Sequence, residues 1–136
     1  MSECVDANIF VRLLTGDEPE QSQRSLDLFE RAARGEVDLW TSEAVVAEVV
    51  YVLGSTRLYA TPRGVIATRF GAVLVNRGLH LGHKESVLRA LRLFGSSNLH
   101  FVDCLWIEHA RRAGMGGIYS FDQALDRVPD VRRLEP

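Results

Sequence analysis

Two acidic residues in this chain directly follow segments that have the pattern of β-strands. Asp6 comes after a short amino-terminal strand that ends at Cys4-Val5, and Asp122 comes after a strand at 117–120. In open α/β sheets, ligands bind just beyond the carboxyl ends of the strands. Asp is also a good helix N-cap, so each residue alone fits either a catalytic or a structural role. If the two strands are neighbours, both carboxylates emerge at one edge of the sheet.

Glu48 is harder to explain by structure alone. It stands in a helix, predicted over 43–53, that is apolar on every side beyond its first turn. On a helical wheel of about 100° per residue it falls among apolar side chains, and we therefore expect it to be buried. A buried carboxylate costs several kcal/mol unless it is paired, protonated or bound to a cation. A salt bridge to an arginine is the structural alternative.

Asp103 completes the set, at the predicted head of a helix over 104–110. Three or four converging carboxylates cannot all remain ionised unaided, and a divalent cation resolves the repulsion. Oxygen ligands without His or Cys favour Mg²⁺, with Mn²⁺ as a substitute. Such a site activates a bound water and stabilises charge on a phosphodiester. Asn8 and Ser120 are short polar neighbours suited to orienting an acid or a water.

The segments that must position these acids alternate between strands and helices. This alternation favours parallel strands joined by right-handed crossovers. We predict one α/β domain over residues 1–136, with a mostly parallel central sheet of four to five short strands. The first strand is expected to end at Val5. The other strands are expected at 37–40, 78–81, 117–120 and 131–134. Helices are expected at 8–14, 43–53, 62–76, 84–94 and 104–110, and a further one begins at 18–20 and ends before Gly35.

Composition is that of an ordinary globular protein, with 46% hydrophobic and 25% charged residues. A net charge of −2 indicates no general attraction to nucleic acid, although a metal can supply local positive charge. No signal peptide or membrane-length apolar segment is visible. Cys4 and Cys104 lack redox or zinc spacing, and both are expected in the core. We expect a cytoplasmic protein, since free thiols persist in a reducing compartment.

Four short motifs together resemble a known family. They are Val5-Asp6-Ala7-Asn8, Glu48 in its apolar helix, Phe101-Val102-Asp103 and Ser120-Phe121-Asp122. Their order and intervals resemble the PIN domain over essentially the whole chain, and the length resembles the VapC group of bacterial and archaeal type II toxin–antitoxin ribonucleases. One departure is Cys104-Leu105-Trp106, which is bulkier than the small residues common there.

The resemblance implies a three-layer α/β/α fold and a Mg²⁺-dependent endoribonuclease. Its acidic quartet, which would be both the catalytic residues and the metal ligands, would be Asp6, Glu48, Asp103 and Asp122. It also implies a homodimer, a small antitoxin partner, and an RNA substrate such as tRNA or another structured RNA.

Two other functions fit parts of the pattern. A phosphatase or phosphotransferase of the HAD type would use Asp6 as a covalent nucleophile, but it commonly needs a second acid two residues later and a nearby lysine. Here those places hold Asn8 and only the distant Lys84. A non-catalytic module that binds nucleic acid or protein would use the acids only as helix caps, which leaves Glu48 unexplained.

Overall fold

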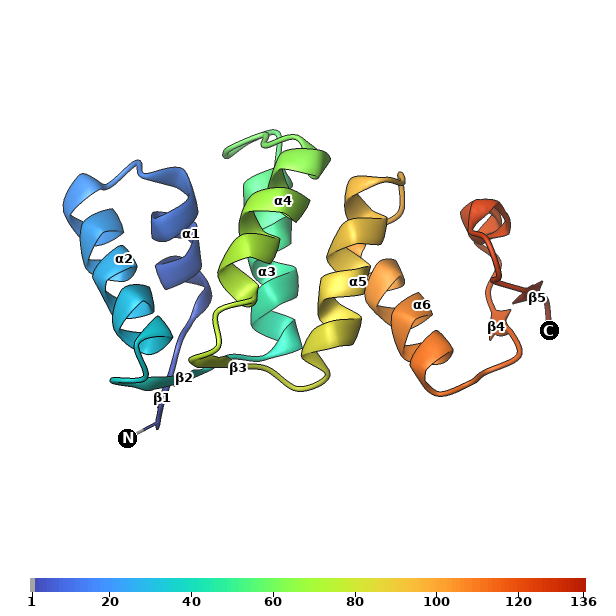
Figure 1. Ribbon diagram of the computed structural model, residues 1–136. Coiled ribbons are helices and arrows are strands. Elements are labelled where there is room, and N and C mark those ends of the chain that lie inside the picture. The colour runs from blue at the N-terminus through green and yellow to red at the C-terminus, as the bar shows by residue number, and fades with distance from the viewer. Residues whose placement is uncertain (1) are drawn as a thin grey trace.

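Three parallel strands form the sheet at the amino-terminal end of the computed structural model, which describes residues 2–136 (Figure 1). They are β1 (Ser2–Cys4), β2 (Asp38–Trp40) and β3 (Leu79–His80), paired in the order β1-β2-β3. Leu39 pairs with Glu3 on one side and with Leu79 on the other. Both leucines are buried, and these apolar side chains anchor the sheet to the helices. The predicted parallel pairing is confirmed for these strands.

Six α-helices and one 3₁₀ helix make up most of the part of the chain that the structure describes, close to their predicted positions. The helices are α1 (Ala7–Thr15), α2 (Pro19–Ala33), α3 (Glu43–Gly54), α4 (Arg63–Leu74), α5 (Lys84–Gly95), α6 (Phe101–Arg112) and η1 (Gln123–Arg127). Among residues 2–136, no helix is long and apolar enough to cross a membrane.

The core centres on Phe10 of α1, which is fully buried. Its ring lies 5.4 Å from that of Phe29 in α2 and 5.3 Å from that of Phe70 in α4, measured between centroids. Close packing between α2 and the start of β3 requires glycine at position 78. A Cβ atom there would lie 2.1 Å from the Ala32 carbonyl oxygen, which no side chain can accommodate. These contacts hold α1, α2, α4 and the sheet together.

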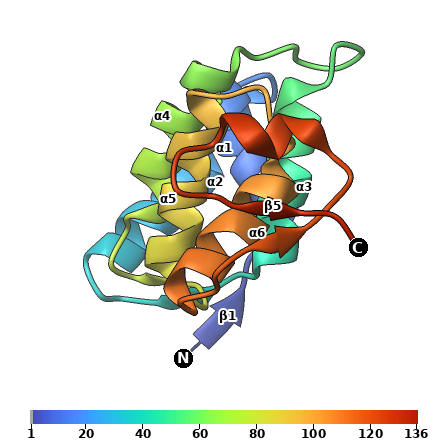
Figure 2. The ribbon, with the colours of Figure 1, turned by 90° about the vertical axis from the view of Figure 1, so that its right-hand side faces the viewer.

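The last two strands do not join this sheet. β4 (Ile118–Tyr119) pairs in parallel with β5 (Arg133–Leu134) as a separate two-stranded sheet. Figure 2 shows β5 and η1 in front of α6, away from β1. The expected single central sheet is therefore divided in two. The strands are only two or three residues long and β1 is exposed throughout, so little burial distinguishes one strand pairing from another.

The two cysteines lie in different surroundings. Cys104 is fully buried, as expected, whereas Cys4 is exposed in β1, so the prediction of a core position for Cys4 is wrong. Alternation along a strand as short as β1 does not reveal which face is covered. Burial raises the pKa of the Cys104 thiol to about 11, so at neutral pH it is an unreactive thiol.

A polar network ties the loop after α1 to the loop after α3. The Tyr59 hydroxyl donates a hydrogen bond of 2.6 Å to the Asp17 carboxylate, and Arg12 donates to both Asp17 and the Tyr59 oxygen. The hydrogen bond from Tyr59, followed by that from Thr15, lowers the pKa of Asp17.

Replacing Tyr59 by Phe should lower the melting temperature by about 2–4 °C at neutral pH. A carboxyl group with a lowered folded-state pKa stabilises the fold above its unfolded pKa, and that contribution disappears as the pH falls. The difference between Tyr59→Phe and wild type should therefore shrink below about pH 3.8, the ordinary pKa of this carboxyl group. Thermal unfolding, followed by circular dichroism at several pH values, measures this difference in melting temperature. An equal difference at pH 7 and pH 3 would contradict this account.

Candidate active site

Asp6 lies at the carboxyl edge of the three-stranded sheet, where its sequence position predicted it. It is exposed, and its carboxylate caps α1 by accepting a hydrogen bond of 3.4 Å from the Ile9 amide. The backbone before it is held to β2, because the Val5 amide donates to the Trp40 carbonyl and the Thr41 hydroxyl donates to the Val5 carbonyl. Asp6 is thus a fixed carboxylate with oxygen lone pairs open to solvent.

Glu48 is exposed on α3, and the prediction that it is buried is wrong. Only one face of α3 enters the core, through Val46, Val49, Val50 and Leu53. Apolar residues on the other faces, including Tyr51 at 74% exposure, remain in contact with solvent. An apolar sequence on all sides did not produce burial on all sides, because folded surfaces retain much apolar area. The cost of burial therefore gives no argument for a cation at Glu48.

The buried acid among residues 2–136 is instead Glu108 in α6, with 5% of its surface exposed. Its carboxylate accepts a 2.6 Å hydrogen bond from Arg111, one turn later on the same helix. The pairing proposed as the structural alternative for Glu48 is thus realised by a different glutamate. Arg111 also donates to the Pro129 carbonyl, so the ion pair attaches the carboxyl-terminal segment to α6.

Asp103 lies within the first turn of α6 and does not cap it. The helix begins at Phe101, with His100 in the N-cap position, three residues before the predicted start. Phe101 is buried against Phe94 of α5, with ring centroids 5.9 Å apart, and this packing extends the helix. Asp103 is half-buried, and a carboxylate in the first turn is favoured by the helix dipole.

Asp122 caps η1 and is exposed. Its carboxylate accepts a hydrogen bond from the Ala124 amide, and its own amide donates to the Ser120 hydroxyl. Ser120 therefore orients the backbone that carries Asp122. Arg133 of β5 holds the same segment by donating to the Ser120 carbonyl and to the carboxylate of Asp126.

The four acids are not assembled into a metal site in this arrangement. Within residues 2–136, no three carboxylate, imidazole or thiol groups lie close enough together to hold one metal ion. Asp6 and Asp122 do not emerge at one edge, because β4 pairs with β5 and not with β1. The oxygen donors of the four acids suit Mg²⁺ chemically.

One contact near the sheet edge was not predicted from the sequence. Glu43, in the first turn of α3, lies 2.9 Å from Nε2 of His109 in α6, and the His109 ring packs edge-on to His83. Since α3 rises from the sheet and α6 returns toward it (Figure 1), this contact sets their register. At 1.5 Å per residue, Glu48 lies about 7.5 Å beyond Glu43 and Asp103 about 9 Å before His109. The two acids therefore stand at nearly the same height, and no local sequence signal joins residues this far apart.

The PIN domain family matches this chain over residues 4–131. The chain belongs to the PIN domain family. The match contains all four predicted acids, and the six helices with parallel strands are consistent with the three-layer PIN fold. No curated protein matches the chain. PIN domains are generally nucleases that hydrolyse nucleic acid, commonly with a divalent metal, so the family supports a nuclease over the phosphotransferase alternative.

Proposed function

We propose that this PIN domain is an endoribonuclease that hydrolyses RNA phosphodiester bonds with Mg²⁺, or Mn²⁺ in its place. The observation that carries the proposal is the family match over 4–131, which contains Asp6, Glu48, Asp103 and Asp122 in the predicted order. A structured RNA such as tRNA is the proposed substrate. The divalent ion would polarise the phosphate and acidify a water.

Within this function, the chain supplies exposed carboxylates on a rigid frame. Hydrolysis requires a base within hydrogen-bond reach of the attacking water. Asp6 is the proposed base. The sheet and the α1 cap hold its carboxylate at an exposed edge, where a water molecule can reach it. Glu48 and Asp103, on helices held in register by Glu43 and His109, are proposed to share the negative charge of the site. Asp122, on the segment held by Arg133, is proposed as the fourth acid of the set.

We further propose that the protein acts in the cytoplasm as the toxin of a VapC-like pair, is inhibited by a small antitoxin, and forms a homodimer. The surface of α3 and α6 supports a protein partner. Tyr51 and Val102 line one hollow of about 270 Å³ between these helices, and Trp106 follows one turn after Val102. These side chains are 62–74% exposed, and apolar surface of this kind marks association sites. Sedimentation of the purified protein tests the dimer.

Incubation of the purified chain with labelled tRNA and total RNA tests the enzymatic proposal. We expect cleavage with Mg²⁺ or Mn²⁺ and none with EDTA, and restored cleavage when the metal is added back. Cleavage that persists in EDTA would refute the metal-dependent mechanism. A folded protein that neither binds Mg²⁺ nor cleaves RNA would assign the chain to the non-catalytic binding modules.

A further inference from the structure

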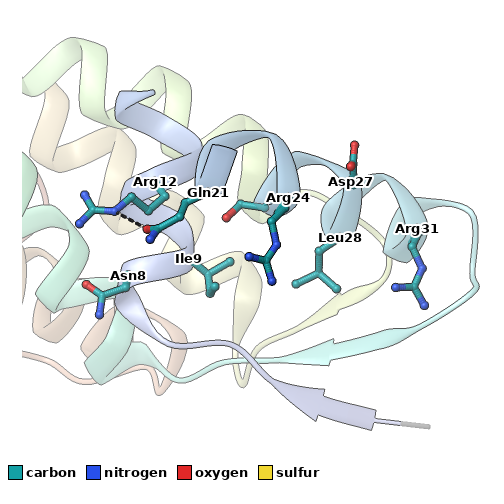
Figure 3. Close-up of a pocket in the computed structure, with 9 residues that line it drawn as sticks. Asn8, Ile9, Arg12, Gln21, Arg24, Asp27, Leu28 and Arg31 are labelled. Atoms are coloured by element: carbon teal, nitrogen blue, oxygen red, sulfur yellow. Dashed lines mark hydrogen bonds between the residues drawn. The ribbon is translucent and has the colours of Figure 1, made fainter. Parts of the chain in front are cut away.

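A groove runs between α1 and α2, beside the proposed catalytic edge of the sheet. It has a volume of about 540 Å³. Three arginines line it, Arg12 from α1 and Arg24 and Arg31 from α2 (Figure 3). Asp27 also lines the groove, so its charged side chains leave a local excess of positive charge in a chain with a net charge of −2.

The two arginines of α2 have guanidinium groups available for a ligand. Among residues 2–136, Arg24 has no ion-pair partner within 4.0 Å, and Arg31 lies 3.6 Å from Glu36, which binds Arg34 more closely at 2.7 Å. Seven residues separate Arg24 from Arg31, which corresponds to about 10.5 Å along the helix. Figure 3 shows both side chains projecting to the same side of α2, while the Asp27 carboxylate points to the other side.

Arg12 has a different role in the groove. It is already held by Asp17, by the Tyr59 oxygen and by the side-chain oxygen of Gln21. These bonds fix it as part of the wall and leave Arg24 and Arg31 as the groups that can turn toward a ligand. The floor between them is apolar, formed by the half-buried Ile9 and Leu28.

The groove lies close to Asp6. Asn8 and Ile9 are among the residues that line it, and the Ile9 amide donates a hydrogen bond to the Asp6 carboxylate. A strand lying against Asn8 and Ile9 would therefore lie close to the Asp6 carboxylate. A second arginine cluster, on α5 and α6, lacks this connection. It lies at the other side of the helical array (Figure 1) and also contains Glu108 and Asp130.

We propose that the α1–α2 groove binds the sugar–phosphate backbone of the RNA on one side of the bond that is cut. This inference rests on the proposed nuclease function. Guanidinium groups bind phosphate through paired N–H donors, and the apolar floor suits a ribose or the face of a base. RNA is favoured over an acidic protein segment because the groove lies close to the proposed cleavage edge, where a substrate strand must pass.

Binding without turnover tests this proposal independently of catalysis. A fluorescent single-stranded RNA would be titrated with the full chain in EDTA at several salt concentrations. We expect Arg24→Gln/Arg31→Gln to weaken binding about tenfold and to reduce the slope of log K against log salt by about 1.4, since each phosphate contact on a single strand contributes about 0.7. The matched control is Arg89→Gln/Arg92→Gln, which removes two exposed arginines of α5 and should leave both quantities unchanged.

The alternatives give distinct results. Unchanged affinity and salt slope in Arg24→Gln/Arg31→Gln, or an equal loss in the α5 control, would overturn the assignment. Tighter binding of a short polyglutamate peptide than of RNA, lost in the same double variant, would assign the groove to a protein partner and also overturn it. Loss of RNA binding in the double variant while wild type fails to cleave RNA would refute the proposed catalysis and leave the groove assignment standing.

Discussion

Replacing Asp6 by Asn should reduce RNA cleavage about a thousandfold or more with little change in stability. Asn caps helices as well as Asp does, so the hydrogen bond from the Ile9 amide to position 6 can be kept. The substitution removes the negative charge and the proton acceptor, and loss of a positioned base or charge-stabilising group typically costs two to four orders of magnitude. Initial cleavage rates in Mg²⁺, together with the urea midpoint of each protein, measure both parts of the prediction.

Glu20→Gln is the matched control for this loss. Glu20 is an exposed carboxylate in the first turn of α2, so its neutralisation changes the net charge by the same amount. We expect the control to retain at least half of the wild-type rate. Cleavage by Asp6→Asn at the rate of Glu20→Gln would remove Asp6 from the active site and leave it as a helix cap only.

The largest effect on stability is expected at Arg111. Changing it to Met leaves the Glu108 carboxylate buried without its cation and releases the Pro129 carbonyl. Breaking a buried pair from one side costs about 3–5 kcal/mol. Because Arg111 itself is partly exposed, we expect the free energy of unfolding to fall by about 2–3 kcal/mol. Urea unfolding measures the change.

Arg112→Met is the control, since this neighbouring arginine is exposed and forms no ion pair within residues 2–136. Its effect should stay within about 0.5 kcal/mol. The double variant Glu108→Gln/Arg111→Met should recover part of the loss, because a neutral amide is less costly to bury than a carboxylate. Arg111→Met and Arg112→Met proteins of equal stability would show that water reaches Glu108 and that the pair is not needed.

Local sequence patterns determined most of the secondary structure. The predicted bounds of α1 to α5 differ from the structure by no more than two residues, because caps, glycines and apolar spacing act over a few neighbouring residues. Local sequence motifs also indicated the family. Asp6, Glu48, Asp103 and Asp122 stand in motifs whose order alone identified the PIN domain, and the match over 4–131 confirmed it.

Only the tertiary structure decided which side chains are buried and which strands pair. Glu48 is exposed and Glu108 is buried, although periodicity pointed to Glu48. The outcome depends on which face of α3 and α6 meets the core, and an apolar helix offers several equivalent faces. The pairing of β4 with β5 and the contact of Glu43 with His109 likewise join distant segments. Such contacts depend on how whole helices pack. Strands of two or three residues contribute too little energy to specify their own pairing partners.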